Sequence, residues 1–405
     1  MDAGVLIVGA GVAGLATAVA LKRVGMRSLV LERSEGLRTS GAGFVLSANA
    51  WRALDALEVS SKLTSVYDPI ENQFVTDVGT GEVQEVPIVK PGRKDTKYAI
   101  RTVHRTALLE ALAEELPADC IRFSSKLASI DQTQVDGGGH IVTVRLEDGA
   151  IFKSKVLIGC DGINSVVAKW MGLAAPVHSG RYGVRGLSTY SQGHEHRFVI
   201  NQFVDTGKRA IFAPLNEKEF CFTLSASHLQ KDFEELKKDV LQHHSGLPWL
   251  FKELIKQSSY LSCAPVMFRS PWAIAFGTLS KGGVTVAGDA MHPMTPDLVQ
   301  GGSSSLEDAV VLGRHIGESY VKNGNKLVAA DVAAVLDKYA RERRWRVALV
   351  AAMSYMAGWS QDIFEGNTNR VKMMLRTMLY GHSWKIFAPI EGFDCGELPK
   401  PTSTT

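Results

Sequence analysis

The first fourteen residues constrain the fold more than any other stretch of the chain. A short apolar run, Val5–Val8, leads into Gly9, Gly11 and Gly14; helical spacing follows, and a second apolar run ends at Glu32. Glycines at this spacing permit a tight turn, the approach of a pyrophosphate to the backbone and close helix–strand packing, while the carboxylate accepts ribose hydroxyl groups. The pattern predicts a dinucleotide-binding βαβ unit. Glu32 favours an unphosphorylated ribose, as in NAD or FAD.

Composition narrows the class of protein. The chain has 405 residues, 45% of them hydrophobic and 21% charged, which is ordinary for a globular protein with a substantial core. A formal net charge of +3 is too small for a typical nucleic-acid binder, so no nucleic-acid partner is expected. The five cysteines lack the paired spacing of a disulfide framework or a zinc site, which predicts a reducing compartment and no metal.

The sequence does not predict membrane insertion. Its start shows no signal-peptide pattern, so we expect a cytoplasmic protein, or a plastid one if a transit peptide is missing. The apolar run Val347–Trp359 is shorter than the roughly 20 residues that span a bilayer, and charged residues flank it. It predicts a packed helix rather than a transmembrane segment.

The periodicity of the remaining chain predicts a mixed α/β fold with a second sheet inserted into the first domain. Helical spacing covers residues 48–59 and 102–116, a β-meander covers 121–162, and the tail from Leu327 is mostly helical. Aromatic-rich strands between 177 and 276 surround one helix. We expect a Rossmann-like dinucleotide-binding domain at 1–73, 98–176 and 277–345, a substrate-binding sheet domain at 74–97 and 177–276, and a C-terminal helical segment at 346–405.

Two later strands each end in a carboxylate. The run 156–159 leads into Asp161-Gly162, which taken alone indicates an ordinary structural turn. The run 284–286 leads into Gly288-Asp289, where a carboxylate beside a cofactor crevice can accept a sugar hydroxyl. Glycines and prolines then bring the start of a helix to the same place. A helix N-terminus stabilises a nearby anion by roughly 0.3–2 kcal/mol.

In this order, the glycine fingerprint, an Arg-x-x-x-Arg motif ending at Arg105, Asp161-Gly162 and Gly288-Asp289 resemble the motifs of one family. It is the single-component (group A) FAD-dependent aromatic hydroxylases, which include para-hydroxybenzoate and salicylate hydroxylases and zeaxanthin epoxidase-like enzymes. The plant salicylate hydroxylase-like monooxygenases look most similar. The resemblance implies FAD as cofactor, NAD(P)H as transient co-substrate, and transfer of oxygen from O2, through a flavin C4a-hydroperoxide, to a small aromatic or alkene-bearing metabolite.

Two alternatives to this activity stay open. One is a flavin oxidase or oxidative rearrangement enzyme on the same fold, working without external NAD(P)H. The other is a non-catalytic flavin-binding regulatory protein. Substrate-stimulated oxidation of NAD(P)H would exclude the second alternative.

The resemblance also implies roles for individual residues. Pro296 and Val299 would line the flavin ring. From its residue type alone, His292 could move a proton at neutral pH, or could make a structural hydrogen bond. Arg185 could steer an anionic substrate, or could pair with a surface carboxylate. The residues expected to bind FAD are Gly9, Gly11, Ala13, Gly14, Glu32, Arg33, Gly43, Phe44, Arg105, Leu127, Asp161, Asp289, Gly301 and Gly302.

The sequence departs from the family pattern at two positions. Val299 stands where the family commonly has glycine, and a left-handed conformation costs a non-glycine residue roughly 1–2 kcal/mol. The loop could therefore take another path, Val299 could add an apolar wall to the pocket, or the position could never need a positive φ. Ala168 replaces a family arginine after the Asp-Gly motif, a departure that bears on nicotinamide use. Together with Val299, it motivates the oxidase alternative.

Three further groups of residues carry weaker hypotheses. Tyr182, Phe203, Phe212 and Phe222 are candidate walls of a substrate pocket, with ordinary core packing as the alternative. The basic run 339–346 could recognise a phosphate, or could be a solvated helix face. Residues 369–381 have apolar spacing that predicts burial, an interface or a membrane-surface contact.

Overall fold

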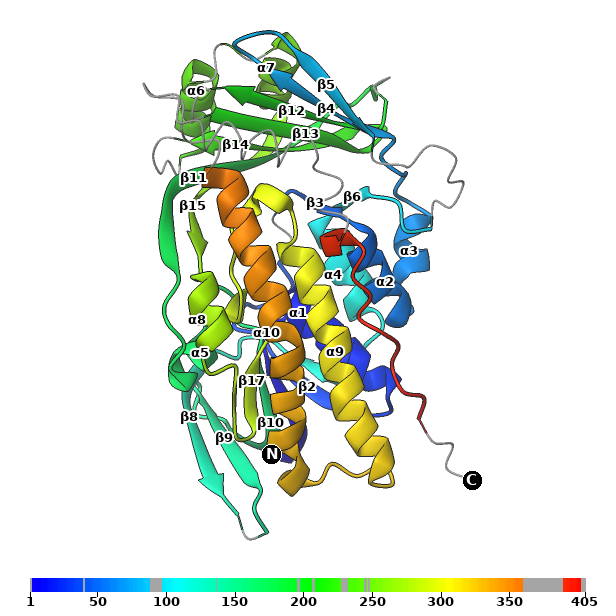
Figure 1. Cartoon of the computed structure of the whole chain (residues 1–405), viewed down its shortest axis with the longest axis vertical. Helices are drawn as coiled ribbons and strands as arrows, with labels where there is room; N and C mark the ends of the chain where they lie inside the picture. The colour runs from blue at the N-terminus through cyan, green and yellow to red at the C-terminus, as the bar shows by residue number, and fades with distance from the viewer. Residues whose placement is uncertain are drawn as a thin grey trace.

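The computed structural model describes residues 2–38, 41–87, 97–135, 137–194, 197–205, 208–226, 232–243, 246, 248–359 and 389–401. Two sheets lie one above the other, and the long strands β11 (Val177–Thr189) and β15 (Ser258–Phe268) connect them along one side (Figure 1). The helices α9 (Gly301–Lys322) and α10 (Ala329–Trp359) run between the lower end of the molecule and the second sheet. The predicted mixed α/β class is confirmed.

The first sheet places a ligand-binding edge at the end of β1 (Asp2–Val8). Its strand order is β16-β17-β10-β1-β2-β7, and β1 pairs in parallel with β10 on one side and β2 on the other. The carboxyl end of β1 is therefore a topological switch point, where open α/β sheets bind ligands. The elements of this domain are α1 Val12–Arg23, β2 Ser28–Leu31, β3 Gly43–Leu46, α2 Ala48–Ala56, α3 Ser60–Thr64, β6 Arg101–His104, α4 Arg105–Ala113, η1 Ala118–Cys120, β7 Ile121–Arg122, β8 Leu127–Gln134, β9 His140–Leu146, β10 Ile151–Gly159, α5 Val166–Met171, α8 Pro271–Phe276, β16 Ser280–Lys281, β17 Val284–Val286, η2 Gly288–Ala290 and η3 Pro296–Leu298.

The second sheet has different surroundings on its two faces. Its strand order is β15-β11-β14-β13-β12-β4-β5. On one face, side chains such as Val184 and Phe212 form a core with Phe251 of α7. On the other, Ala213 and Cys221 pack with Ala42, next to β3 of the first domain. The remaining elements are β4 Asn72–Asp77, β5 Val83–Pro87, β12 Val199–Asp205, β13 Lys208–Asn216, β14 Glu219–Ala226, α6 Phe233–His243 and α7 Trp249–Lys256.

The helices α1 and α9 pack closely and in parallel. A Cβ added to Gly313 would lie 2.6 Å from Cβ of Ala20, and one added to Gly317 would lie 2.8 Å from Cγ1 of Val24. Both partners advance along the chain in the same direction, so the two helices point the same way. Their N-termini consequently lie at the same end of the pair, beside the switch point.

The structure corrects two sequence predictions. The helix expected at 102–116 begins only at Arg105, because 101–104 form β6, an antiparallel partner of β3. The segment Ile121–Arg122 is β7, which pairs with β2 in the first sheet, so the meander starts later, at β8. Main-chain hydrogen bonding to distant strands decides both cases, and sequence spacing does not report it.

The C-terminal helix α10 is packed along much of its length, with Val347, Val350 and Ala351 buried. It passes without interruption through residue 346, the expected start of a separate segment; the domain boundaries themselves stay a prediction. Among the described residues, no helix combines the length and apolarity needed to cross a membrane. Residues 369–381, for which burial or an interface was expected, lie outside the described residues.

Candidate active site

The glycine turn after β1 leaves the start of α1 open. Gly9 has φ 104°, and a Cβ there would lie 2.5 Å from the carbonyl oxygen of Cys160. A Cβ on Gly14 would meet the carbonyl oxygen of Gly9, so both positions require glycine. Gly11, in contrast, has no atom within 4 Å of its missing Cβ, and no side chain caps the helix that follows. The start of α1 therefore has no capping side chain and has open space beside Gly11, as a pyrophosphate requires.

Glu32 lies at the edge of this turn, directly after β2. Its Oε2 accepts the N–H of Ala10 at 2.7 Å, and its Oε1 accepts the N–H of Ser34 at 2.9 Å. These bonds fix a buried carboxylate beside the glycines. A carboxylate held there can still accept ribose hydroxyls, because each oxygen has a second lone pair.

The start of α9 forms the second open helix end. Its first two residues are Gly301 and Gly302, and no side chain caps the helix. Gly288 joins it to α1, since a Cβ there would lie 2.8 Å from Cβ of Ala13 and 3.0 Å from Oγ of Ser305. The neighbouring Asp289 is exposed and forms no hydrogen bond or ion pair with any described residue. A free carboxylate beside two uncapped helix ends can accept a sugar hydroxyl.

Arg105, the first residue of α4, is half-buried and forms no ion pair with a described carboxylate. Its Nε has no hydrogen-bond partner among the described residues. Burial, together with the charges of Arg38 and Arg185, lowers the pKa of Arg105, although Asp289 acts in the opposite direction. The three arginines and Asp289 thus meet in one region, and a cluster of arginines is suited to an oxygen-rich or anionic ligand.

Behind the turn at Gly288 lies a buried charge network. Oδ2 of Asp308 is 2.7 Å from Nε2 of His292 and accepts the N–H of Gly288 at 2.8 Å. Oδ1 of Asp308 accepts Nε of Arg343 at 2.7 Å, and Arg343 also pairs with Glu307 at 2.7 Å. Burial alone would raise the pKa of Asp308, but His292 and Arg343 outweigh it and the pKa is lowered. His292 is fully buried, which favours its structural alternative over proton transfer.

The loop before α9 contains the unusual valine. Val299 has φ 56° and ψ 26°, the left-handed conformation that glycine adopts freely, and 37% of its surface is exposed. Val299 therefore adopts the backbone conformation expected of a glycine. The alternative that this position never needs a positive φ is wrong. Pro296 is exposed on the same loop, whereas Asp297 between them is buried. Sequence reasoning missed Asp297, because its partners lie on distant strands.

Asp161 has a clear structural task. Its Oδ1 accepts the hydroxyl of Ser165 at 2.5 Å, and its Oδ2 accepts the N–H of Val166 at 2.7 Å, so it caps the start of α5. Burial raises the pKa of Asp161 despite these bonds. Ala168 is buried in the same helix, where its N–H donates to Oγ of Ser165 at 2.8 Å. The structural alternative for Asp161 gains support, while a contact with a cofactor stays a prediction.

The other residues expected to bind FAD have varied surroundings. Arg33 is exposed and without a partner among the described residues. A Cβ on Gly43 would lie 2.7 Å from Cδ2 of Leu215, so this glycine permits contact with the second sheet. Phe44 lies against Gly302, at 3.5 Å from the position of an added Cβ. Leu127 is buried in the core at the start of β8.

For three of the aromatic candidates, the structure supports the alternative of ordinary core packing. Phe212 and Phe222 are buried in the core beneath α6 and α7, and Phe203 packs against that core. Strand alternation instead turns Arg185 toward the first domain. Its neighbours in register are Thr223 of β14 and Ser262 of β15, which sequence reasoning missed. Arg185 is exposed and pairs with no carboxylate of the described residues.

Strand parity also places Tyr182 with Val184 rather than with Arg185, so Tyr182 is not aligned with the face that carries Arg185. Tyr260, paired with Leu187, belongs to the face of Arg185 and contributes to the electrostatic surroundings of Arg105. No local motif distinguishes these residues, because the face that each presents depends on register across several strands.

The basic run 339–346 does not form a phosphate site on its own. Arg343 and Arg346 are engaged with Glu307, and Nη1 of Arg344 donates to the carbonyl of Ala275 at 2.8 Å. Arg341 pairs with Asp337 on the helix surface. The arginines of this run are therefore mainly structural.

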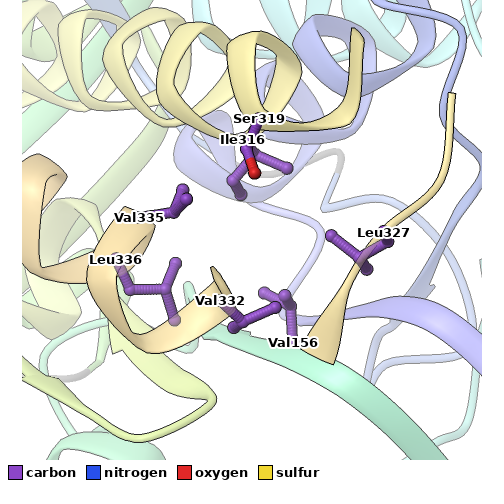
Figure 2. Close-up of a pocket in the computed structure, with 7 residues that line it drawn as sticks. All are labelled: Val156, Ile316, Ser319, Leu327, Val332, Val335 and Leu336. Carbon is purple, nitrogen blue, oxygen red and sulfur yellow. The ribbon is translucent and has the colours of Figure 1, made fainter. Parts of the chain in front are cut away.

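An apolar pocket lies at the far end of α9 (Figure 2). Its walls are Val156 of β10, Ile316 and Ser319 of α9, and side chains from the first turns of α10, including Val332 and Leu336. Ser319 is roughly 27 Å along the helix from Gly301, at 1.5 Å per residue. This pocket is separate from the two helix starts and offers little polarity for a cofactor.

Together, these features fit a flavin dinucleotide. The missing Cβ of Gly11 leaves room for the pyrophosphate, Glu32 is suited to the ribose, Asp289 to further hydroxyls, and α9 brings free N–H groups to the same crevice. The anion-binding turn, the switch point and the second helix end define a dinucleotide-binding oxidoreductase fold with an added second sheet. Among the described residues, no group of His, Cys, Asp and Glu could hold a metal ion.

Comparison with known proteins identifies the family. Residues 2–354 match the family described as FAD binding domain. Monooxygenase 2 of Arabidopsis thaliana is 36% identical over 410 residues, which cover 97% of this chain and 98% of the relative. The structure of Klebsiella pneumoniae HpxO with FAD and uric acid has a TM-score of 0.78 at 23% identity, covering 98% of this chain and 96% of that one. A salicylate hydroxylase substrate complex has a TM-score of 0.74 at 21% identity, covering 100% and 99%.

The chain belongs to the FAD-dependent aromatic hydroxylase family and is an FAD-dependent monooxygenase. The family resemblance seen in the sequence motifs is thereby confirmed, as is FAD as the cofactor. The alternative of a non-catalytic flavin-binding protein is not supported.

Proposed function

We propose that this monooxygenase uses NAD(P)H and O2 to hydroxylate or epoxidise a small aromatic or alkene-bearing metabolite that carries negative charge. One oxygen atom enters the substrate, and the other leaves as water while NAD(P)H is oxidised. The observation that carries the proposal is Arg185, exposed and unpaired among the described residues, near Arg105 and on the sheet face turned toward the cofactor domain. An anionic substrate would supply the missing counter-charge.

In this proposal the residues of the chain bind and orient. The free N–H groups at the start of α1 hold the pyrophosphate, with Glu32 on the ribose and Asp289 on the ribityl chain. Arg105 and the N–H groups at the start of α9 would bind near the isoalloxazine ring and would favour negative charge there. When bound, FAD supplies the redox and oxygen chemistry. The protein supplies position and shields the site from water.

The substrate would bind between the second sheet and the ring. Arg185 would bind its anionic group, flanked by the hydroxyls of Thr223 and Ser262. Pro296 and Val299, both exposed on the loop before α9, would form an apolar wall on the opposite side. The cysteines are all free thiols, which supports the reducing, cytoplasmic compartment that we propose for the enzyme.

The test follows flavin absorbance anaerobically in the holoenzyme during addition of NADH or NADPH. Hydroxybenzoates are compared with the matched hydroxybenzamides, which lack the charge. We expect faster bleaching with the charged member of a pair. Arg185→Gln should reduce this stimulation at least about tenfold, and Thr223→Val should change it little, since a charge-assisted hydrogen bond contributes more than a neutral one. Equal stimulation by both members would contradict an anionic substrate.

The same experiment addresses the oxidase alternative, which the left-handed Val299 and Ala168 keep open. Reduction of the flavin by a ligand alone, with no response to either nicotinamide, would replace the proposal by an oxidase or oxidative rearrangement activity. Ligand-dependent consumption of NAD(P)H and O2, with oxygen-18 from O2 in the product, would support monooxygenation.

A further inference from the structure

Asp297 is held by two arginines of the second sheet. Its side chain is only 3% exposed. Nη1 and Nη2 of Arg181 in β11 donate to its two carboxylate oxygens at 3.0 and 2.7 Å. Nη1 of Arg209 in β13 donates to Oδ1 at 3.3 Å and to the backbone carbonyl of Asp297 at 3.3 Å. We call Asp297, Arg181 and Arg209 the Asp297 clamp.

The clamp is itself fixed from both sides. Nη2 of Arg209 donates to Oε1 of Gln202 in β12 at 3.0 Å, and Gln202 is 1% exposed. On the other side α10 packs directly on the ion pair, because a Cβ on Gly358 would lie 2.4 Å from Oδ2 of Asp297. One turn earlier, Oγ of Ser354 donates to the carbonyl of Thr295 at 2.5 Å. The backbone just before Val299 is therefore anchored to a sheet and to a helix.

Val299 follows this anchored segment and adopts a backbone conformation that is unfavourable for valine. Its N–H donates to the carbonyl of Pro296 at 3.0 Å, which closes the turn, and φ is 56°. A left-handed non-glycine residue is disfavoured about 5- to 30-fold relative to its ordinary conformations. The side chain is too exposed for its own packing to account for this, so the conformation must be imposed by neighbouring residues.

We propose that Arg181 and Arg209 are positioning residues: through Asp297 they hold Val299 in the left-handed conformation and so direct the N–H groups at the start of α9 toward the flavin. Gln300, Gly301 and the rest of α9 follow Val299 without a break, so the turn at Val299 sets where the helix begins. The charge-assisted bonds of a buried, bidentate arginine–carboxylate pair are strong enough to offset the strain.

The test is a double-mutant cycle on FAD affinity, measured by titrating apoprotein with FAD and following flavin fluorescence. Asp297→Asn keeps the shape but weakens the clamp, and Val299→Gly removes the strain. We expect Asp297→Asn to weaken FAD binding about 5- to 30-fold with valine at 299, and less than about twofold with glycine there. An equal loss in both backgrounds would overturn the proposal, because Asp297 would then act independently of Val299.

Arg209→Gln provides a second route if Asp297→Asn fails to fold. It removes the longer bonds of the clamp, so a smaller loss of about 2- to 5-fold is expected, again relieved by Val299→Gly. No loss in either clamp variant would also overturn the proposal. Asp148→Asn, which removes an exposed partner of Arg122, is the control and should leave FAD affinity unchanged. Because FAD binding needs no substrate, this outcome is independent of the proposed substrate class.

Discussion

The N-termini of α1 and α9 both lie at the candidate cofactor site, but different features of the sequence shape them. Both α1 and α9 lack a capping side chain and present free N–H groups. At α1, the approach of a pyrophosphate depends on the absence of side chains, since Gly9 and Gly14 lie where there is no room for a Cβ. At α9, two arginines from distant strands bind Asp297, two residues before a valine in a glycine-like conformation, and we propose that they hold this valine in place. The first arrangement is written mostly in a local glycine pattern, although Gly9 also adjoins Cys160, whereas the second is assembled from distant strands.

The largest expected effect comes from breaking the charged support of α9. Replacing Arg343 by Met leaves Glu307 and Asp308 buried without their shared partner, so the free energy of unfolding should fall by about 3–5 kcal/mol. Urea denaturation of the apoprotein measures this. Arg341→Met removes an exposed pair with Asp337 on the same helix and should change stability by less than about 0.5 kcal/mol. Similar losses in the two variants would mean that the network contributes no special support.

Substitutions of the glycines at the start of α1 should affect stability and FAD binding to different extents. Gly14→Ala places a Cβ against the carbonyl oxygen of Gly9, so we expect a loss of about 1–3 kcal/mol in stability and weak FAD binding. Gly11→Ala meets no atom within 4 Å and should leave apoprotein stability nearly unchanged. It should nevertheless weaken FAD binding, because the added methyl occupies the pyrophosphate approach. Unchanged FAD affinity in Gly11→Ala would disprove that assignment.

Acid should change the contributions of Asp297 and Asp161 to folding stability in opposite directions. Arg181 and Arg209 hold the pKa of Asp297 below its usual value despite burial, so its stabilisation is present above the unfolded pKa of about 3.9 and lost as pH falls through the folded pKa. Burial raises the pKa of Asp161, so its protonation at low pH relieves a cost instead. Each group contributes at most about 1.4 kcal/mol per pH unit.

Urea unfolding of the apoprotein between pH 6 and pH 3 therefore distinguishes the two carboxylates. Relative to the wild type, Asp297→Asn should lose less stability on acidification, and Asp161→Asn should lose more. Parallel pH profiles for all three proteins would contradict both directions of pKa shift.

The smallest effect is expected at Val299. Glycine there relieves a strain of about 1–2 kcal/mol but gains about 0.4–1 kcal/mol of freedom in the unfolded chain, so the net stabilisation should be about 0.5–1 kcal/mol. Thermal unfolding of the apoprotein checks this. Val66→Gly, at an exposed valine without positive φ, makes the same chemical change and should be destabilising. Equal effects at the two sites would show that Val299 carries no strain.

The parts of the fold that sequence predicts well are those written in local patterns. The first βαβ unit follows from apolar runs and glycines, because Gly14 is required by the carbonyl oxygen of Gly9 in the same turn, and open space lies beside Gly11. The predictions for the start of α4 and for residues 121–122 were wrong, since both depend on hydrogen bonds to strands far along the chain. Local spacing contains no information on those partners.

The candidate site divides in the same way. Motifs locate Gly11, Glu32 and Asp289, whose proposed roles depend on the turn or strand end in which each residue lies. The Asp297 clamp could not be predicted from local motifs, because Arg181 lies 116 residues and Arg209 88 residues away from Asp297 in the sequence. The proposed substrate face could not be predicted either, since strand register decides that Arg185 and not Phe222 is turned toward the cofactor domain.

The left-handed Val299 also has a consequence for directed evolution. Valine and glycine codons differ at a single second base, so the strain-free residue is one point mutation away. Val299 is partly exposed, and removing its side chain opens no large cavity. A library selected only for thermal survival should therefore recover glycine at 299 early. A library selected at the same time for oxygen transfer would reveal whether the two methyl groups are retained for their contact with the reacting substrate.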